Sequence, residues 1–520
     1  MRLDYLEILM INLNHSTTVR LLKPMKRIIL TLLLLPLVTM KFRLNYFVSF
    51  IVLFGFCCTK SVLANQHAES TKKPNIIMVF IDDMGWGDFS SFGNTEASTP
   101  NIDRLAKEGI AFEQFYVNSP ICSPSRVAIS TGQYPQRWGI NSFLSNRKAN
   151  AERGIRDWLD LEAPILAGIL HNADYATGHF GKWHMGGQRD VHEAPLITEY
   201  GFDESITNFE GLGARILPLK YSPGNKPPTQ HNLGSDTLGH GPVIWHDRAF
   251  VTEKFTEAAV TFAKAASARD QPFYLNLWPD DVHTPMYPPL EKWGDGANRH
   301  LYLKVLETMD EQLSVLFDLV HNDEKLRANT IIVVCSDNGP EVGFGSAGHL
   351  RGHKATLFEG GIRSSLIVWS PSRLNNTSKG KRNTDSIFSA IDLAPSLLSI
   401  AGVSSDVVFD GENLKDTLLG NSTTSRSQPL FFRRPPDRED FRHYKGLPDL
   451  AVRDGNWKLF CDYEGTNPEL YNLSNDPSET TNVVSENTLI AGKLTQAVLS
   501  WNASMPQDNG RELGQKTREN

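Results

Sequence analysis

Four apolar runs that each end in polar residues constrain the fold of this chain more than any other feature. Residues 75–81 have the sequence Asn-Ile-Ile-Met-Val-Phe-Ile, and Asp82 and Asp83 follow them directly. A run of this kind is typical of a strand that is buried on both faces. Three more runs show the same pattern: residues 175–180 lead into Lys182 and His184, 273–278 into Asp280, Asp281 and His283, and 330–335 into Asp337 and Asn338.

Helical patterns lie between these runs, for example at residues 102–106 and 252–268. Strands that alternate with helices predict an α/β fold with a mostly parallel central sheet flanked by helices. Ligands bind at the carboxyl ends of the strands in such sheets, so the polar clusters mark the expected site. The Pro- and Gly-rich segment 221–242 is predicted to be a long loop, which either lines the substrate cleft or is a surface excursion.

A chain of 520 residues exceeds one minimal domain. We expect a catalytic domain at residues 72–420, which contains the four apolar runs. A Ser/Thr-rich segment begins near residue 420, and beyond it residues 457–460 have a strand pattern and 489–501 a helical one. Residues 421–520 are therefore predicted to form a smaller C-terminal α+β subdomain with a small antiparallel sheet and a terminal helix.

The first 64 residues are predicted to be an N-terminal extension and signal peptide. Their apolar stretches, 28–38 and 46–58, are shorter than the roughly 20 residues that span a bilayer, so we expect no stable membrane anchor. Basic residues precede the second stretch, and small residues favour cleavage after Ala64 by the export machinery. A true start at Met40 would make the first 39 residues an upstream extension. The protein is expected to be exported, either periplasmic or secreted.

Net charge limits the possible partners. Residues 1–64 carry eight Lys or Arg and two Asp or Glu, so their removal changes the formal charge from −7 to −13. An acidic protein is not expected to bind nucleic acid, and an anionic substrate needs a local basic pocket.

Cys122, Cys335 and Cys461 remain after cleavage, and this odd number excludes a complete disulfide framework. Cys335 lies in an apolar run and is predicted to be a buried thiol.

Cys122 belongs to a different pattern. Residues 122–126, Cys-Ser-Pro-Ser-Arg, match the motif Cys-x-Pro-x-Arg. Ser123 is predicted to be a helix N-cap and Pro124 the first helical residue, which places Cys122 at a helix N-terminus, where anions are favoured. A structural cysteine on a turn would not require Arg126 one turn later.

The polar ends of two runs suggest a metal site. Asp82, Asp83, Asp337 and Asn338 offer only oxygen ligands, which hard cations such as Ca²⁺ or Mg²⁺ prefer and Zn²⁺ does not. Taken alone, the second pair could instead form a simple turn with Gly339.

Through residues 122–126 and 181–186 (Gly-Lys-Trp-His-Met-Gly), the chain resembles the formylglycine-dependent sulfatases of the arylsulfatase A-like type in the alkaline phosphatase superfamily. The resemblance covers nearly all of residues 72–480. It implies an alkaline-phosphatase-like fold and a sulfuric ester hydrolase that acts on a sulfated carbohydrate or an aryl sulfate. It also implies that a formylglycine-generating enzyme oxidises Cys122 to 3-oxoalanine, whose hydrate attacks sulfur and forms a covalent sulfo-enzyme intermediate.

The resemblance further implies a role for each matched residue. Arg126 would stabilise the hydrate, Lys182 and His184 would contact it and the sulfate, and His184 would be the base of the second step. His283 would be the general acid, and Lys354 would hold the sulfate. The implied Ca²⁺ ligands are Asp82, Asp83, Cys122, Asp337 and Asn338. The sequence departs from the family at residues 364–365, Ser-Ser in place of the usual Val-Pro, and we expect this to affect loop packing more than chemistry.

Two other functions stay open at this point. One is a phosphomonoester or phosphonate ester hydrolase of the same superfamily, because phosphate and sulfate are both tetrahedral anions. The other is a non-catalytic glycan-binding relative. Several residues near the matched segments could contact a sugar or could merely pack in loops: Trp245, His246, Arg248, His349 and Arg351.

Overall fold

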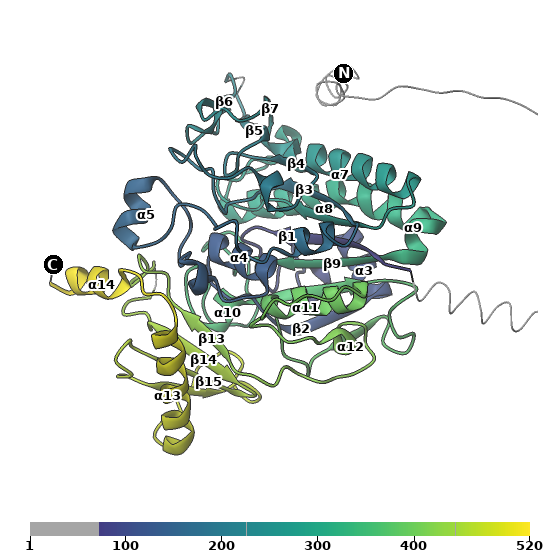
Figure 1. The fold of residues 1–520 in the computed structure, drawn as a ribbon. Helices are drawn as coiled ribbons and strands as arrows, with labels where there is room; N and C mark the ends of the chain where they lie inside the picture. The colour runs from purple at the N-terminus through teal and green to yellow at the C-terminus, as the bar shows by residue number, and fades with distance from the viewer. Residues whose placement is uncertain (1–71, 225, 443, 520) are drawn as a thin grey trace, which may run out of the picture. The chain divides into compact units, whose positions relative to one another are not determined.

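The computed structural model describes residues 72–519 except 225 and 443, and the chain from Lys73 onward forms one compact unit. Figure 1 shows a large twisted sheet flanked by helices and a separate smaller sheet. The predicted α/β fold with a mostly parallel central sheet is confirmed. The predicted signal peptide and the alternative start lie outside the described residues. Among the described residues, no helix is long and apolar enough to cross a membrane.

The four predicted buried strands lie side by side in the middle of the large sheet. Their order is β9 (Thr330–Ser336), β1 (Asn75–Ile81), β8 (Phe273–Trp278) and β3 (Ala176–Gly181), and every neighbouring pair is parallel. All their residues are buried, as their continuous apolar sequences require. Because the strands are parallel, their carboxyl ends meet at one edge of the sheet.

Further strands extend the large sheet on both sides. On the β9 side, β10 pairs antiparallel with β9 and with β2, whereas β4 and β5 continue the parallel order beyond β3. Ser364 and Ser365 lie within β10, beside a register shift, and not in a loop as expected. The remaining strands are β2 (Ile110–Tyr116), β4 (Glu204–Thr207), β5 (Ala214–Lys220), β6 (Thr229–Gln230), β7 (Val243–Asp247), β10 (Arg363–Trp369), β11 (Lys381–Asn383) and β12 (Phe388–Ser389).

Helices cover both faces of the large sheet. Alternate residues of β1, among them Ile76 and Phe80, share a hydrophobic core with α4, α6 and α11, so the intervening residues face the other side. On that side α7 packs on β3, β8 and α8. The helices are α3 (Pro100–Glu108), α4 (Cys122–Thr131), α5 (Arg147–Arg153), α6 (Leu166–His171), α7 (Val251–Ala268), α8 (Asn298–Asn322), α9 (Glu324–Asn329), α10 (Glu359–Ile362), α11 (Ala390–Ala401) and α12 (Lys415–Leu418).

The C-terminal part holds the small antiparallel sheet and the helix that the sequence predicts. The sheet order is β13 (Leu430–Arg433), β14 (Leu450–Asp454), β15 (Trp457–Cys461) and β16 (Glu469–Asn472), and α13 (Thr488–Ser504) packs on it before α14 (Gly510–Glu519). Its hydrophobic core also includes Tyr116, Phe358 and Ile391. The two sheets therefore share a core, and the proposed boundary near residue 420 stays a prediction.

Candidate active site

Three carboxylates meet at the carboxyl ends of β1 and β9. The two strands are in register from Asn75 to Ile81, so Asp82 and Asp83 emerge beside Asp337. Ligand oxygens of these three residues lie within 4.8 Å of one another, and all three residues are fully buried. The Asp83 amide donates to Asp337 Oδ1 at 3.1 Å, which fixes the arrangement.

This cluster has the donor set of a hard cation. Burial and the neighbouring Asp82 raise the pKa of Asp337 well above its usual value. A divalent cation would therefore relieve the repulsion between these two carboxylates. Asn338 donates its amide hydrogens to Asp83 Oδ1 at 2.8 Å and to the Gly339 carbonyl at 2.9 Å. Its own Oδ1 is buried without a hydrogen-bond partner, as expected of a ligand oxygen. The residues therefore fit Ca²⁺.

Cys122 lies at the N-terminus of α4, as predicted, but it is itself the first helical residue, so the prediction of Ser123 as N-cap and Pro124 as first helical residue is wrong. The N-cap is Ile121, and the Ser123 hydroxyl instead accepts from the Leu144 amide at 2.9 Å. Pro124 still costs no hydrogen bond, because amides of the first turn have no partner within a helix. Burial raises the pKa of the Cys122 thiol to about 12 in spite of nearby Lys182, so the thiol is protonated at neutral pH.

Arg126 joins the helix to the carboxylate cluster. Its guanidinium is fully buried and donates to Asp337 at 2.8 Å, to Asp82 at 3.1 Å and to the Lys182 carbonyl at 3.0 Å. Burial alone would lower its pKa, but the two carboxylates outweigh burial and raise the pKa. The group is a permanent positive charge in the floor of the site.

Lys182 and His184 follow β3 and turn toward the same region. Gly181 permits this turn, because a Cβ there would lie 2.1 Å from the Trp278 carbonyl oxygen. The Lys182 ammonium lies 2.7 Å from Asp82 and 3.1 Å from Glu210. Nδ1 of His184 lies 3.0 Å from Glu210, and its Nε2 lies 3.0 Å from the Leu144 carbonyl oxygen.

His283 and Lys354 complete the site from the other side of Asp83. The Lys354 ammonium lies 2.6 Å from Asp83 Oδ2, and Nε2 of His283 lies 3.6 Å from the same atom. Nδ1 of His283 lies 2.7 Å from the Thr284 carbonyl oxygen, so this nitrogen carries a hydrogen. The His283 side chain is 28% exposed, whereas Lys182 and His184 are almost completely buried.

Part of this site lines a pocket of about 330 Å³. Cys122, His184, His283 and Lys354 line it together, although they come from four distant parts of the chain. Segment 221–242 contributes His231 and Leu233, which favours the cleft-lining interpretation of that loop. The other lining residues are Ile121, Phe143, Arg189, Phe209, Glu210, Thr284, Glu341, Ala355, Arg438, Phe441 and Arg442.

Comparisons with known proteins agree with this geometry. The Sulfatase family model matches residues 74–403, which include the carboxylate cluster, Asn338, Cys122, Arg126, Lys182, His184, His283 and Lys354. The chain belongs to the sulfatase family. It is therefore a sulfuric ester hydrolase. A second model, N-sulphoglucosamine sulphohydrolase, C-terminal, matches residues 349–501 of the sulfatase.

Two relatives and two solved structures show how far the likeness extends. N-acetylgalactosamine-6-sulfatase of Canis lupus familiaris is 32% identical, over 75% of this chain and 72% of the relative. N-acetylgalactosamine-6-O-sulfatase of Bacteroides thetaiotaomicron is 28% identical, over 85% and 96%. The structure of Ps i-CgsB with k-i-k-neocarrahexaose has a TM-score of 0.67 at 26% identity, covering 83% of this chain and 93% of that chain. A sulfatase structure from work on glycosaminoglycan metabolism by Bacteroides thetaiotaomicron has a TM-score of 0.65 at 25% identity, covering 83% and 99%. These likenesses confirm the expected alkaline-phosphatase-like fold.

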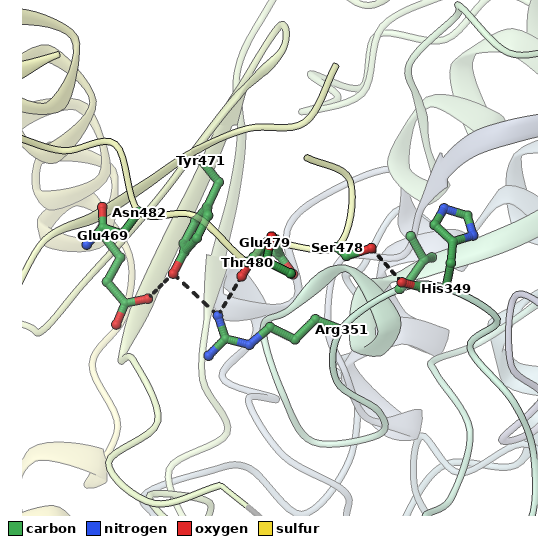
Figure 2. Close-up of a pocket in the computed structure, with 9 residues that line it drawn as sticks. His349, Arg351, Glu469, Tyr471, Ser478, Glu479, Thr480 and Asn482 are labelled. Carbon is green, nitrogen blue, oxygen red and sulfur yellow. Dashed lines mark hydrogen bonds between the residues drawn. The ribbon is translucent and has the colours of Figure 1, made fainter. Parts of the chain in front are cut away.

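The sulfatase has a second pocket, at the junction with the small sheet. His349 and Arg351 line it with residues of β16 and the following loop, not with Cys122 (Figure 2). Arg351 donates to the Tyr471 hydroxyl at 3.4 Å and to the Glu479 carbonyl at 3.0 Å. No residue of the carboxylate cluster reaches this pocket, so neither His349 nor Arg351 is placed to contact a sugar at the sulfate site.

Of the other suggested sugar contacts, Arg248 is buried and bound to the Asp280 carboxylate at 2.8 Å, so it is not accessible to a ligand.

Glu210 is a residue of the site that the sequence analysis missed. It follows β4, whose residues are mostly half-buried or exposed, so no apolar run marks the strand end. The parallel pairing of β4 with β3 brings Glu210 to the edge of the sheet that carries Lys182.

Proposed function

We propose that this sulfatase hydrolyses the sulfate esters of a sulfated saccharide, with residue 122 as the nucleophile after oxidation of Cys122 to formylglycine. The position of Cys122 carries the proposal. It lies on the wall of a pocket, at the first turn of a helix, where Asp82, Lys182 and Lys354 are all close enough to affect its pKa. Such a pocket suits a nucleophile that must approach a tetrahedral anion.

Saccharides are the favoured substrate class because of the relatives. Those described above include sulfatases of N-acetylgalactosamine-6-sulfate and a structure with a bound neocarrahexaose. A pocket of about 330 Å³ with several aromatic walls suits one sugar ring, since aromatic faces pack on sugars.

Asp82, Asp83, Asp337 and Asn338 would hold Ca²⁺, with the modified residue 122 as a further ligand. When bound, the ion would favour the ionised form of the nucleophile and neutralise charge on the sulfate oxygens. The unpartnered Oδ1 of Asn338 and the raised pKa of Asp337 support this assignment.

Positive side chains of the chain itself hold the sulfate group. Lys182 and Lys354 are both fixed by carboxylates, so they are oriented before the substrate arrives. Arg126 lies deeper, between Asp82 and Asp337, and keeps these carboxylates in place. Because these charges are buried, their attraction for the non-bridging oxygens is far less screened than at the surface.

Two histidines act as the general acid and the general base. Nδ1 of His283 is held by the Thr284 carbonyl, so Nε2 is the atom that donates a proton to the leaving oxygen at the open side of the pocket. His184 is the base that takes a proton from the side chain of residue 122. The Glu210 carboxylate, 3.0 Å from Nδ1 of His184, would stabilise the positive charge that the ring gains when it takes this proton.

Maturation and export form part of the proposal. A formylglycine-generating enzyme would oxidise Cys122, and cleavage after Ala64 would release an exported protein. N-terminal sequencing of the protein from the culture medium or the periplasm tests the second step. A mature chain that begins at residue 65 is expected, and an uncleaved chain that stays with the cells would contradict export.

The function itself is tested by sulfate release. Purified protein, co-expressed with a formylglycine-generating enzyme, is given a panel of sulfated mono- and oligosaccharides, an aryl sulfate and the matched aryl phosphate. We expect sulfate from at least one saccharide, with the Cys122→Ala variant inactive. Faster turnover of the aryl phosphate than of the aryl sulfate would contradict the proposal, and so would binding of sulfated glycan without any sulfate release.

A further inference from the structure

The outer wall of the active-site pocket carries more positive charge than the proposed chemistry uses. Arg189, Arg438 and Arg442 all line the pocket, and none of them belongs to the carboxylate cluster or to the proposed catalytic set. Their own partners decide whether these charges are available to a ligand.

Arg442 is neutralised within the protein. Its guanidinium forms an ion pair with Glu341 and donates to the Val342 carbonyl at 3.1 Å. Arg438 is only partly neutralised. One of its terminal nitrogens lies 3.0 Å from the Asp437 carboxylate, but its Nε is buried without a hydrogen-bond partner.

Asp437 has more than one positive neighbour. It also lies 3.7 Å from Arg153, whose donors are directed inward to the carbonyl oxygens of Ala149 and Phe143 and to the side chain of Asn150. Burial lowers the pKa of Arg153, and Arg438 and Arg189 lower it further, while Asp437 opposes them. The Arg438 and Arg153 guanidinium groups thus share one carboxylate, and Arg189 is near enough to Arg153 to lower its pKa.

The positive charge of Arg189, in contrast, is not paired with a carboxylate of the described residues. Within residues 72–519 that the structure describes, its side chain has no ion pair or hydrogen bond, and its Nε is buried. The adjacent acid, Asp190, accepts from the Arg147 amide at 3.0 Å. Gln188 holds the segment in place, since its side chain donates to the carbonyls of Ser145 and Asp157 at 3.1 and 3.0 Å. A rigid segment therefore presents an unpaired cation at the pocket.

The backbone supports a ligand-binding role for this segment. Arg189 has a φ of 52°, in the left-handed region that non-glycine residues rarely adopt. His184, Ala355 and Arg442 line the same pocket, and they also have positive φ values of 53°, 71° and 52°. Conformations of this kind persist where the surroundings enforce them, and they cluster at ligand sites.

We propose that Arg189, assisted by Arg438, forms a second anion-binding position in this pocket, so that the preferred substrate carries a carboxylate or a second sulfate in addition to the ester that is cleaved. The inference rests on the proposed function, since it concerns the same pocket and the same substrate. A guanidinium presents two parallel N–H groups, which match the paired oxygens of either anion. Phe143 and Phe441 flank Arg438, with ring centres 5.3 and 5.6 Å from its guanidinium carbon, and hold it in position.

The test compares three saccharides that share one sulfate ester. The first has no other charge, the second has a second sulfate, and the third is linked to a uronic acid. For each, kcat/KM is measured with the wild type, Arg189→Ala and Arg189→Lys. Lys148→Ala is the control, because it removes a positive charge from a side chain that is 87% exposed and does not line the pocket.

We expect a second anion to raise the kcat/KM of the wild type about tenfold or more, and Arg189→Ala to remove most of this ratio, chiefly through KM. Arg189→Lys should restore part of it, and Lys148→Ala should leave it unchanged. The substrate with the larger ratio identifies the anion as sulfate or carboxylate. A wild-type ratio near one, or a ratio in Arg189→Ala within about twofold of the wild type, would overturn the inference.

A binding measurement separates this inference from the proposed function. Dissociation constants of the same saccharides are measured by calorimetry in the Cys122→Ala background, with and without Arg189→Ala. A preference for two anions that depends on Arg189 supports the second position even if no saccharide is hydrolysed, in which case only the proposed function fails. Hydrolysis without any preference for substrates with two anions would contradict the second anion-binding position and would still support the proposed function.

Discussion

Glu210 places a buried carboxylate oxygen 3.0 Å from Nδ1 of His184, and the same oxygen lies 3.1 Å from the Lys182 ammonium. The nearby positive groups outweigh burial and lower the pKa of Glu210 to about 2, so it is ionised at neutral pH. Lys182 and His184 match the family motif, whereas Glu210 lies outside it. One carboxylate thus orients two proposed catalytic groups.

Replacing Glu210 by Gln keeps the size of the side chain and removes its charge. We expect kcat on an aryl sulfate to fall about 10- to 100-fold, because Lys182 and His184 lose the partner that orients them. Steady-state kinetics test this, with Glu162→Gln, an exposed residue, as the control. A kcat close to the wild-type value would show that Glu210 has no positioning role.

The role of His283 predicts a dependence on the leaving group. A sugar alcohol needs a proton as it leaves, whereas nitrophenolate does not. His283→Gln should therefore lower kcat on a sugar sulfate by about 10²- to 10⁴-fold and affect 4-nitrophenyl sulfate much less. Parallel assays of both substrates measure the difference. Equal losses on the two would argue against His283 as the general acid.

The carboxylate cluster predicts calcium-dependent stability. A ligand that binds only the folded state stabilises it by about 2.7 kcal/mol at 100 times its Kd. Thermal unfolding of chelator-treated wild type should therefore shift to higher temperature as Ca²⁺ is added. In Asp337→Asn, which loses one of the three charges, this shift should be much smaller at the same Ca²⁺ concentration. Equal shifts in the two proteins would place the calcium elsewhere.

Sequence alone predicts the centre of the sheet well, for a physical reason. Strands β1, β8 and β9 are buried on both faces, so their sequences are continuous apolar runs, and their polar ends identify Asp82, Asp337 and His283. Short motifs locate Cys122 and Lys182 in the same way. These features are local, and a single segment contains each of them.

The rest of the pocket wall could not be predicted, because its residues come from segments that only the tertiary structure brings together. Glu210 follows a short, half-exposed strand, and Arg189 and Arg438 lie on irregular segments about 250 residues apart. The N-cap prediction for Ser123 failed for the same reason, since its hydroxyl binds the Leu144 amide, 21 positions away.

Asp310 of α8 predicts a specific pH dependence of stability. Its carboxylate accepts from the Asn101 and Ile102 amides of α3 at 3.1 and 2.9 Å, but burial still raises its pKa from 3.8 to about 6. The folded state therefore binds the proton more tightly than the unfolded state, and stability falls as pH rises from about 4 to 6.

In Asp310→Asn this contribution is absent. The stability of the wild type relative to Asp310→Asn should therefore decrease by up to about 3 kcal/mol between pH 4 and pH 7. Unfolding of both proteins at several pH values measures this difference. A constant difference, or one that grows with pH, would contradict the raised pKa.

The central claim is that the side chain of residue 122 acts as formylglycine. The most direct measurement is the mass of the tryptic peptide that ends at Arg126, taken from protein co-expressed with a formylglycine-generating enzyme and assayed beside Cys122→Ala. We predict that this peptide carries an aldehyde and that only the modified protein releases sulfate. Sulfate release by protein in which Cys122 remains entirely a thiol would contradict the account.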